Sequence, residues 1–259
     1  MTAPAGFSVT AIGGMPLFAP GMSVAAEIAR ALDRSGEALR DGDVVVIAQK
    51  IVSKAEGRLV RLAGVQPSTE ASRLAGETGR PAPLVQLILD ESEAVMRATK
   101  AAIIVRHRTG HVLANAGIDA SNVAGNVEGG DADTVLLWPA DPDASARRIR
   151  GELGAKVAVI VADSLGRAWR MGTLGTAIGC AGLTAIEDRR GQSDLFGRTL
   201  QATVIATADS LAAAAVLAMG EGAEGTPVAI VRGAGKWVTE EDGPGAAAQL
   251  RPLAEDMFR

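Results

Sequence analysis

Two short polar segments follow apolar runs and carry the residue types that bind a hard cation. The first, residues 115–123, contains two side-chain amides, a hydroxyl and the carboxylate of Asp119, with Gly117 allowing a bend. The second begins at Asp163 and Ser164, just after the apolar run 157–161. Carboxylate, carbonyl and hydroxyl oxygens are the ligands that Mg²⁺ and Mn²⁺ prefer over sulfur or imidazole. The pair of loops therefore predicts a divalent cation held between them and shared with a phosphate.

Each loop is also compatible with a purely structural interpretation. Asp and Asn side chains often bond their own backbone in Asx-turns, which need no ligand. Because both loops occur in one chain, and Arg167 and Arg170 accompany the second, a cation site is favoured. The two guanidinium groups suit a carboxylate or phosphate of a substrate, although an arginine beside an aspartate is often only a salt bridge.

Lysines and a glycine-rich segment are further candidates for phosphate contact. Lys50 and Lys54 follow the apolar strand predicted for residues 44–48, on what reads as a polar loop, where lysines more often are simply solvated. Residues 220–225 match G-x-G-x-x-G, but they follow a predicted helix and precede a strand, the reverse of the dinucleotide-binding order. Three glycines still allow close backbone approach to a phosphate, with Glu221 as the reactive side chain.

Other catalytic arrangements are not favoured. His107 and His111 have the spacing of a helical metal pair, but the intervening Arg-Thr-Gly is typical of a turn. Two histidines and one cysteine give no nucleophile arrangement, and Cys180 lies among small apolar residues, as a buried cysteine does. The cation, lysines and arginines together indicate phosphoryl transfer to a carboxylate, followed by attack of an amine.

Composition excludes several classes of partner. A net charge of −4, with 3% aromatic residues and no basic run, argues against nucleic-acid binding. The longest apolar run, 211–219, is too short to span a membrane, and the first residues lack a signal-peptide pattern, so we expect a cytoplasmic protein. A single cysteine excludes an internal disulfide and is consistent with that compartment. With 259 residues and 47% apolar content, we treat residues 1–259 as one domain.

Helical and strand patterns alternate without a regular βαβ period, which favours an α+β fold with mixed sheets over a doubly wound sheet. A mobile connection is predicted at 124–134 and a peripheral tail at 234–259. The predicted helices are 24–39, 67–78, 83–97, 143–153 and 209–219. Residues 7–18 are predicted to form a short strand that ends in a turn. The other predicted strands are 44–48, 101–106, 111–114, 157–161, 200–206 and 228–231.

With these residues identified, the chain closely resembles the F420 gamma-glutamyl ligase family, the coenzyme F420-0:L-glutamate ligases. The two long matching segments, 41–57 and 115–123, are highly specific. Shorter matches follow in family order at 141–148, 162–167, 177–179, 194–197 and 219–222.

The resemblance implies a ligase that uses GTP, with Mg²⁺ or Mn²⁺ at two sites and a monovalent cation such as K⁺. A carboxylate of F420-0 becomes an acyl phosphate, and the amine of L-glutamate displaces phosphate. Further glutamates follow through gamma linkages. The resemblance also implies an intertwined homodimer. The alternatives are a paralogue that ligates an amino acid to another carboxylate, and a non-catalytic nucleotide-binding protein with the same fold.

The resemblance also assigns roles by motif. Asp119 and Asp163 would be metal ligands and catalytic, Ser164 would contact a second metal, and Lys54 would be catalytic. The implied GTP contacts are Met15, Pro16, Leu17, Phe18, Gln49, Lys50, Lys54, Asn122, Gly220, Glu221 and Gly222.

Overall fold

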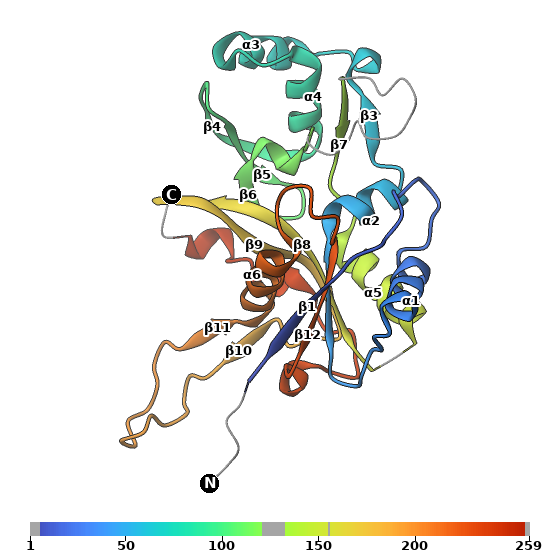
Figure 1. Ribbon diagram of the computed structural model, residues 1–259. Coiled ribbons are helices and arrows are strands. Elements are labelled where there is room, and N and C mark those ends of the chain that lie inside the picture. The colour runs from blue at the N-terminus through green and yellow to red at the C-terminus, as the bar shows by residue number, and fades with distance from the viewer. Residues whose placement is uncertain (1–5, 121–132, 155, 257–259) are drawn as a thin grey trace.

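The computed structural model describes residues 6–120, 133–154 and 156–256. Its centre is a five-stranded mixed sheet in the order β1-β12-β2-β8-β9 (Figure 1). β2 and β8 are parallel, and every other neighbouring pair in this sheet is antiparallel. The mixed α+β class is therefore confirmed. The strands are β1 (Ser8–Ile12), β2 (Val44–Ala48), β8 (Ala158–Arg167), β9 (Arg170–Ala181) and β12 (Val228–Arg232).

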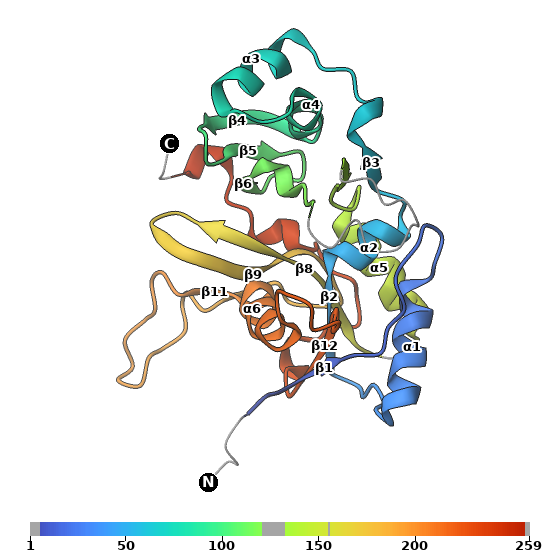
Figure 2. The same ribbon diagram turned by 45° about the horizontal axis from the view of Figure 1, so that its top comes forward.

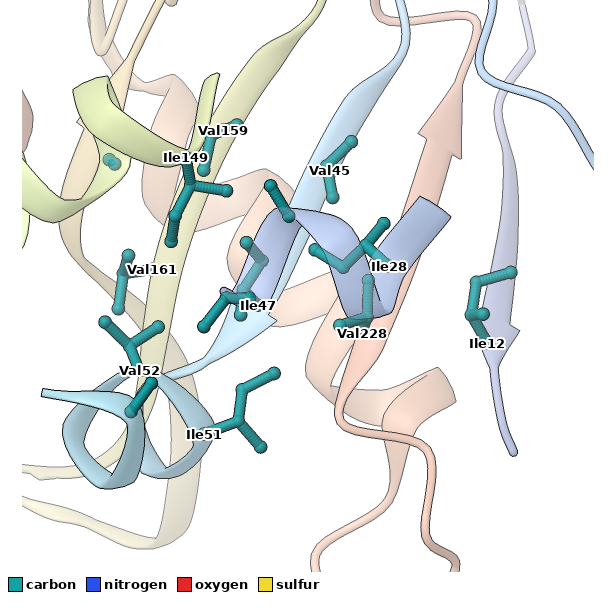
Figure 3. Close-up of a cluster of buried hydrophobic side chains, with 14 of the residues drawn as sticks. Ile12, Ile28, Val45, Ile47, Ile51, Val52, Ile149, Val159, Val161 and Val228 are labelled. Atoms are coloured by element: carbon teal, nitrogen blue, oxygen red, sulfur yellow. The ribbon is translucent and has the colours of Figure 1, made fainter. Parts of the chain in front are cut away.

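Helices cover both faces of this sheet, with α1 and α5 on one side and α6 on the other (Figure 2). The bounds are α1 (Val24–Ser35), α2 (Gln49–Ala55), α5 (Pro142–Leu153) and α6 (Thr207–Met219). Because successive strand side chains point to opposite faces, Val45 and Ile47 pack toward α1 and α5 (Figure 3), whereas Val44 and Val46 pack toward α6. Each fully buried aliphatic side chain of this kind contributes roughly 1.5–3 kcal/mol, so β2 anchors the chain that follows it.

A smaller layer of two helices and a three-stranded sheet lies next to β8 and β9 (Figures 1 and 2). It has its own apolar core, which includes Leu74, Val85, Ile88 and Val105. Its elements are α3 (Thr69–Thr78), α4 (Ala82–Asp90), β4 (Ser92–Ala98), β5 (Ile103–His107) and β6 (Val112–Ala114).

Short elements complete the described chain. Two two-stranded sheets pair β3 (Leu59–Arg61) with β7 (Thr134–Leu136), and β10 (Ile186–Asp188) with β11 (Val204–Ala206). The 3₁₀ helices are η1 (Leu62–Gly64), η2 (Asn115–Gly117), η3 (Gly235–Trp237), η4 (Ala246–Gln249) and η5 (Leu253–Glu255). No helix within the described ranges is long and apolar enough to cross a membrane.

Several predicted boundaries are wrong. The helix predicted at 83–97 ends at Asp90, and residues 92–98 instead pair with β5, because strand pairing outweighs their local preference. Asp143 and Asp209 do not cap their helices. Asp141 caps α5, while the Asp143 carboxylate accepts hydrogen bonds from the backbone of Cys180 (2.8 Å) and Ala246 (2.7 Å).

The segment predicted to be a peripheral tail makes specific contacts where it is described. Ala234 and Ala246 are fully buried. Asp242 pairs with Arg150 at 2.6 Å, which ties the segment to α5. Of the predicted mobile connection, residues 124–132 lie outside the described residues, and Thr134 begins β7.

Candidate functional site

The segments predicted to bind nucleotide and cation meet at one end of the five-stranded sheet. β2 and β8 are parallel with Ala48 opposite Ala162, so the residues that follow each of them are neighbours. β1 is antiparallel to β12 with Ile12 opposite Val228, so the chain leaving β1 and the chain entering β12 reach that same end. The register of the sheet therefore brings together four segments that are far apart in the sequence.

A cleft of about 760 Å³ opens where these segments meet. It is lined by most of the predicted site residues, although the binding and catalytic roles assigned to them stay predictions. The lining residues from that set are Met15, Pro16, Leu17, Phe18, Gln49, Lys50, Lys54, Asp119, Asp163, Ser164, Gly220, Glu221 and Gly222.

Asp119 reaches the cleft from a tight turn. Its backbone exchanges two hydrogen bonds with Leu136, at 3.0 and 2.8 Å. Gly117 has φ +67° and lies against the indole of Trp138, where a β-carbon would stand only 2.4 Å from Nε1, so only glycine fits. Asn115 does not form an Asx-turn here, because its Oδ1 accepts from the distant backbone N–H of Ile103 at 3.1 Å.

Asp163 lies within β8 rather than in a loop after it, which corrects the prediction. The strand continues past Ala162 because it pairs with β9 as far as Arg167, through a register shift at Val161 and Ala162. The Oδ2 atom of Asp163 accepts from Trp138 Nε1 at 2.7 Å, and its Oδ1 accepts from the Ser164 backbone at 2.8 Å.

The electrostatic environment of Asp163 follows from that position. The pKa of its carboxyl is raised to about 6, chiefly by burial and also by the nearby Asp119 charge, against the lowering effect of the bonds from Trp138 and Ser164 and of the charge of Lys50. Burial outweighs the two hydrogen bonds. The carboxylate is therefore held in an environment that favours a proton or another positive charge.

A third carboxylate, that of Glu221, joins the cleft through the glycine-rich segment. Ser164 Oγ donates to Glu221 Oε1, and Glu224 Oε2 accepts from the Gly222 backbone at 2.8 Å. The sequence indicated Glu221 as the reactive group of its segment and, through the resemblance, as a GTP contact. It did not indicate the contact with Ser164, because no spacing relates two residues 57 positions apart. Within the described ranges, no three acidic, histidine or cysteine side chains converge as a metal-binding group.

The two lysines lie on helix α2, not on a loop. One turn separates Lys50 from Lys54, so both lie on the same side of the helix. Lys50 Nζ forms an ion pair with Asp119 Oδ2 at 2.7 Å. Burial, and secondarily the charge of Lys50, lowers the pKa of Lys54. Two ammonium groups that face one cleft provide positive potential for an anionic ligand.

Gln49 presents an unused donor. Its side chain is almost fully buried, and its Oε1 accepts from Ser53 Oγ at 2.8 Å. Its Nε2 is buried without a hydrogen-bond partner among the described residues. A buried donor left unpaired costs about 1–3 kcal/mol, so an acceptor supplied by a ligand would fit here.

Two predicted site residues, Arg167 and Arg170, are not brought to the described cleft. Arg167 and Arg170 flank the exposed turn between β8 and β9, and Arg167 donates to the Gly172 backbone at 3.2 Å. Asn122 lies outside the described residues. The substrate-binding role of the two arginines stays a prediction.

Comparison with known proteins agrees with the resemblance. A family model described as F420-0:Gamma-glutamyl ligase matches residues 14–233. The "Coenzyme F420:L-glutamate ligase" of Methanothermobacter thermautotrophicus is 45% identical over 258 residues, which cover 98% of this chain and 99% of that protein. Proteins of the same name from Methanocaldococcus jannaschii and Archaeoglobus fulgidus are each 42% identical, covering 85% and 86% of this chain and 86% of each protein. The matched region contains every described residue of the cleft that we have discussed, and the chain belongs to the F420-0:gamma-glutamyl ligase family.

Proposed function

We propose that this protein is a GTP-dependent ligase that joins L-glutamate to a carboxylate of F420-0 and then adds further glutamates through gamma linkages. The observation that carries the proposal is that Asp119, Asp163 and the two α2 lysines line one cleft. Family membership supports the substrates, since the relatives bear the name coenzyme F420:L-glutamate ligase.

The donor atoms of the cleft fit a divalent cation such as Mg²⁺ or Mn²⁺. The oxygens of Asp119 and Asp163 would hold one ion, and the hydroxyl of Ser164 with the carboxylate of Glu221 would serve a second. These side chains supply only part of a coordination shell, so phosphate oxygens and water would complete it. When bound, such ions neutralise charge on the phosphates. A monovalent ion such as K⁺ is part of the proposal only through the family resemblance.

The protein residues would bind and orient the nucleotide. Lys50 and Lys54 would offset negative charge on the phosphates, and Gln49 Nε2 would donate to an acceptor of GTP. The loop 15–18 and the backbone of 220–222 line the same cleft and would contact the nucleotide.

Two displacements account for the reaction. A carboxylate oxygen of F420-0 attacks the γ-phosphorus of GTP, and the bond to GDP breaks, which leaves an acyl phosphate. The glutamate amine attacks the acyl carbon, phosphate leaves with the bonding electrons, and the amine proton passes to solvent. Both steps build negative charge that the lysines can stabilise. Arg167 and Arg170 would bind substrate carboxylates, and we propose a cytoplasmic homodimer as the working form.

A direct assay tests the activity. The protein is incubated with F420-0, L-glutamate, GTP and Mn²⁺, and the products are followed by mass spectrometry. Successive glutamyl increments that require GTP, and that disappear in Asp163→Asn, are expected. Asp90→Asn, an exposed change on α4, should retain activity.

The assay also separates the alternatives. If GTP turnover with glutamate requires a carboxylate other than F420-0, the chain is a paralogue with a different acceptor. If GTP binds and no acceptor promotes its turnover, the chain is a nucleotide-binding protein of this fold without ligase activity. Either result would overturn the proposed reaction.

A further inference from the structure

Trp138 connects the two segments that carry the cleft aspartates. Its side chain is fully buried, and its Nε1–H donates to Asp163 Oδ2 at 2.7 Å. Two residues earlier, Leu136 exchanges both backbone hydrogen bonds with Asp119. The short segment 136–138 is therefore bonded to one aspartate through its backbone and to the other through the indole. Its geometry sets where the two carboxylates stand relative to each other.

The backbone of Trp138 is fixed from outside the cleft. Arg58 Nε donates to the Trp138 carbonyl at 2.8 Å, and the backbone N–H of Leu137 donates to the Arg58 carbonyl at 3.1 Å. Arg58 is itself held by Glu91, 2.8 Å from its guanidinium, and Glu91 is only 6% exposed. A largely buried ion pair thus holds the residue that clamps Trp138.

The indole ring is fixed by the β5–β6 hairpin. The centroid of His107 lies 4.9 Å from that of Trp138, and the His111 ring meets the indole edge-on at 5.5 Å. Thr109 Oγ1 contacts Nδ1 of both imidazoles, at 2.8 and 2.9 Å, so the two rings are held as a unit. The histidine spacing noted in the sequence thus serves to pack an indole rather than to bind a metal.

The edge of the indole that bears Nε1 abuts the turn before Asp119. A β-carbon on Gly117 would stand 2.4 Å from Nε1. Gly117 lies against the Nε1 edge of the indole, and His107 and His111 pack against its rings. The indole therefore has no room to turn away from Asp163. Its N–H is therefore directed at one carboxylate oxygen, while the other oxygen is held by the Ser164 backbone.

We propose that Trp138 is a positioning residue for the cation site: its indole N–H orients the Asp163 carboxylate relative to Asp119. The inference rests on the proposed function, because it assigns the two carboxylates to a divalent cation. Groups that orient the carboxylate ligands of a metal typically change its affinity by 10–100-fold when they are removed. Neither the family match nor the sequence pattern singled out this residue.

Calorimetric titration with Mn²⁺ alone tests the proposal. Trp138→Phe retains an aromatic ring but removes the N–H donor, and we expect it to weaken Mn²⁺ binding about tenfold or more. Trp237→Phe is the matched control, because Trp237 Nε1 also donates to a carboxylate, Glu187, at 2.7 Å, outside the cleft. It should bind Mn²⁺ like the wild-type protein. In an Asp163→Asn background, Trp138→Phe should add little, since the two changes act through one carboxylate.

These titrations distinguish failure of the positioning role of Trp138 from failure of the cation site itself. If Trp138→Phe binds Mn²⁺ as the wild type does while Asp163→Asn binds it weakly, the positioning role is wrong and the cation site stands. If Asp163→Asn leaves Mn²⁺ binding unchanged, the cation site itself is wrong, and the positioning role falls with it.

A second measurement does not depend on the stability of Trp138→Phe. The chain has three tryptophans, so Trp169→Phe and Trp237→Phe identify by elimination the indole N–H proton resonance of Trp138. This resonance should differ between the wild-type protein and Asp163→Asn. Addition of Mg²⁺ should shift it in the wild-type protein and leave it unchanged in Asp163→Asn. A resonance that is unaffected by Asp163→Asn would overturn the proposal.

Discussion

Lys50 Nζ lies 2.7 Å from Asp119 Oδ2, and both side chains are about one-quarter exposed, at 27% and 26%. The ammonium group thus occupies one side of a carboxylate that we propose as a cation ligand. Lysine and cation would compete for the charge of Asp119, whereas lysine and cation would act together on a triphosphate. Lys50 therefore has opposite effects on the two ligands.

Substitution of Lys50 separates these effects. Lys50→Ala should tighten Mn²⁺ binding in the absence of nucleotide by roughly fivefold, about 1 kcal/mol for a partly exposed ion pair, and should weaken GTP binding. Calorimetry with each ligand measures both changes. Lys156→Ala is the control, because Lys156 is 75% exposed and pairs with Glu240. If both affinities fell together in Lys50→Ala, competition for Asp119 would be refuted.

The raised pKa of Asp163 predicts that the metal-free protein becomes less stable to unfolding as the pH rises. Burial raises the pKa from 3.8 to about 6, so the folded state holds the proton more tightly than the unfolded state. The resulting stabilisation is fully present below pH 3.8 and is lost as the pH rises through 6. About two pKa units correspond to at most about 3 kcal/mol, and the open cleft reduces this value.

Asp163→Asn removes this titration while keeping an oxygen that accepts from Trp138. In urea unfolding with EDTA, the variant should gain stability relative to wild type between pH 4 and pH 8, up to the bound above. Mn²⁺ at pH 8 should then stabilise the wild type and not the variant, because only a ligand of the folded state raises its stability. A stability difference that does not vary with pH would contradict the raised pKa.

Much of this architecture could be predicted from local sequence. The apolar run 44–48 is a buried strand with the predicted bounds, and Ser68 and Gly79 flank α3 as their cap preferences indicate. Local rules failed where distant contacts decide. Residues 92–98 form a strand because β5 is available to pair with them, and Asp143 serves the backbones of Cys180 and Ala246 rather than its own helix.

The site shows the same division. That Asp119 and Asp163 lie in one cleft could be predicted from their residue type and from the apolar runs that precede them. Trp138 and the contact of Glu221 with Ser164 could not, because each depends on the register of the sheet and on segments 25 or 57 residues apart. A buried tryptophan is most often core, and only the orientation of its N–H shows a connection to the cleft.

The proposed homodimer predicts a measurable mass. Four large apolar side chains are almost fully exposed: Trp169 and Met171 (each 97%) in the β8–β9 hairpin, and Leu195 (98%) and Phe196 (89%) between β10 and β11. Light scattering should give twice the 26.4 kDa chain mass. The double variant Leu195→Asp and Phe196→Asp should lower the mass toward that of one chain. Leu217→Asp, at a side chain of α6 that is 85% exposed, should not. A wild-type protein that stays monomeric at all concentrations tested would refute the dimer.

Gly117 should tolerate no side chain, because two independent costs coincide there. Its φ of +67° is unfavourable for other residues by about 1–2 kcal/mol, and a β-carbon would overlap Trp138 Nε1 at 2.4 Å, where overpacking costs about 1–3 kcal/mol. Gly117→Ala should therefore lose about 2–5 kcal/mol in urea unfolding. Gly151→Ala, within α5 and with no atom near the added carbon, should instead gain about 0.5–1 kcal/mol. Since the indole must move to admit the new methyl group, Gly117→Ala should also shift the Trp138 N–H resonance. A variant as stable as wild type, with that resonance unmoved, would mean that the turn before Asp119 does not constrain the indole.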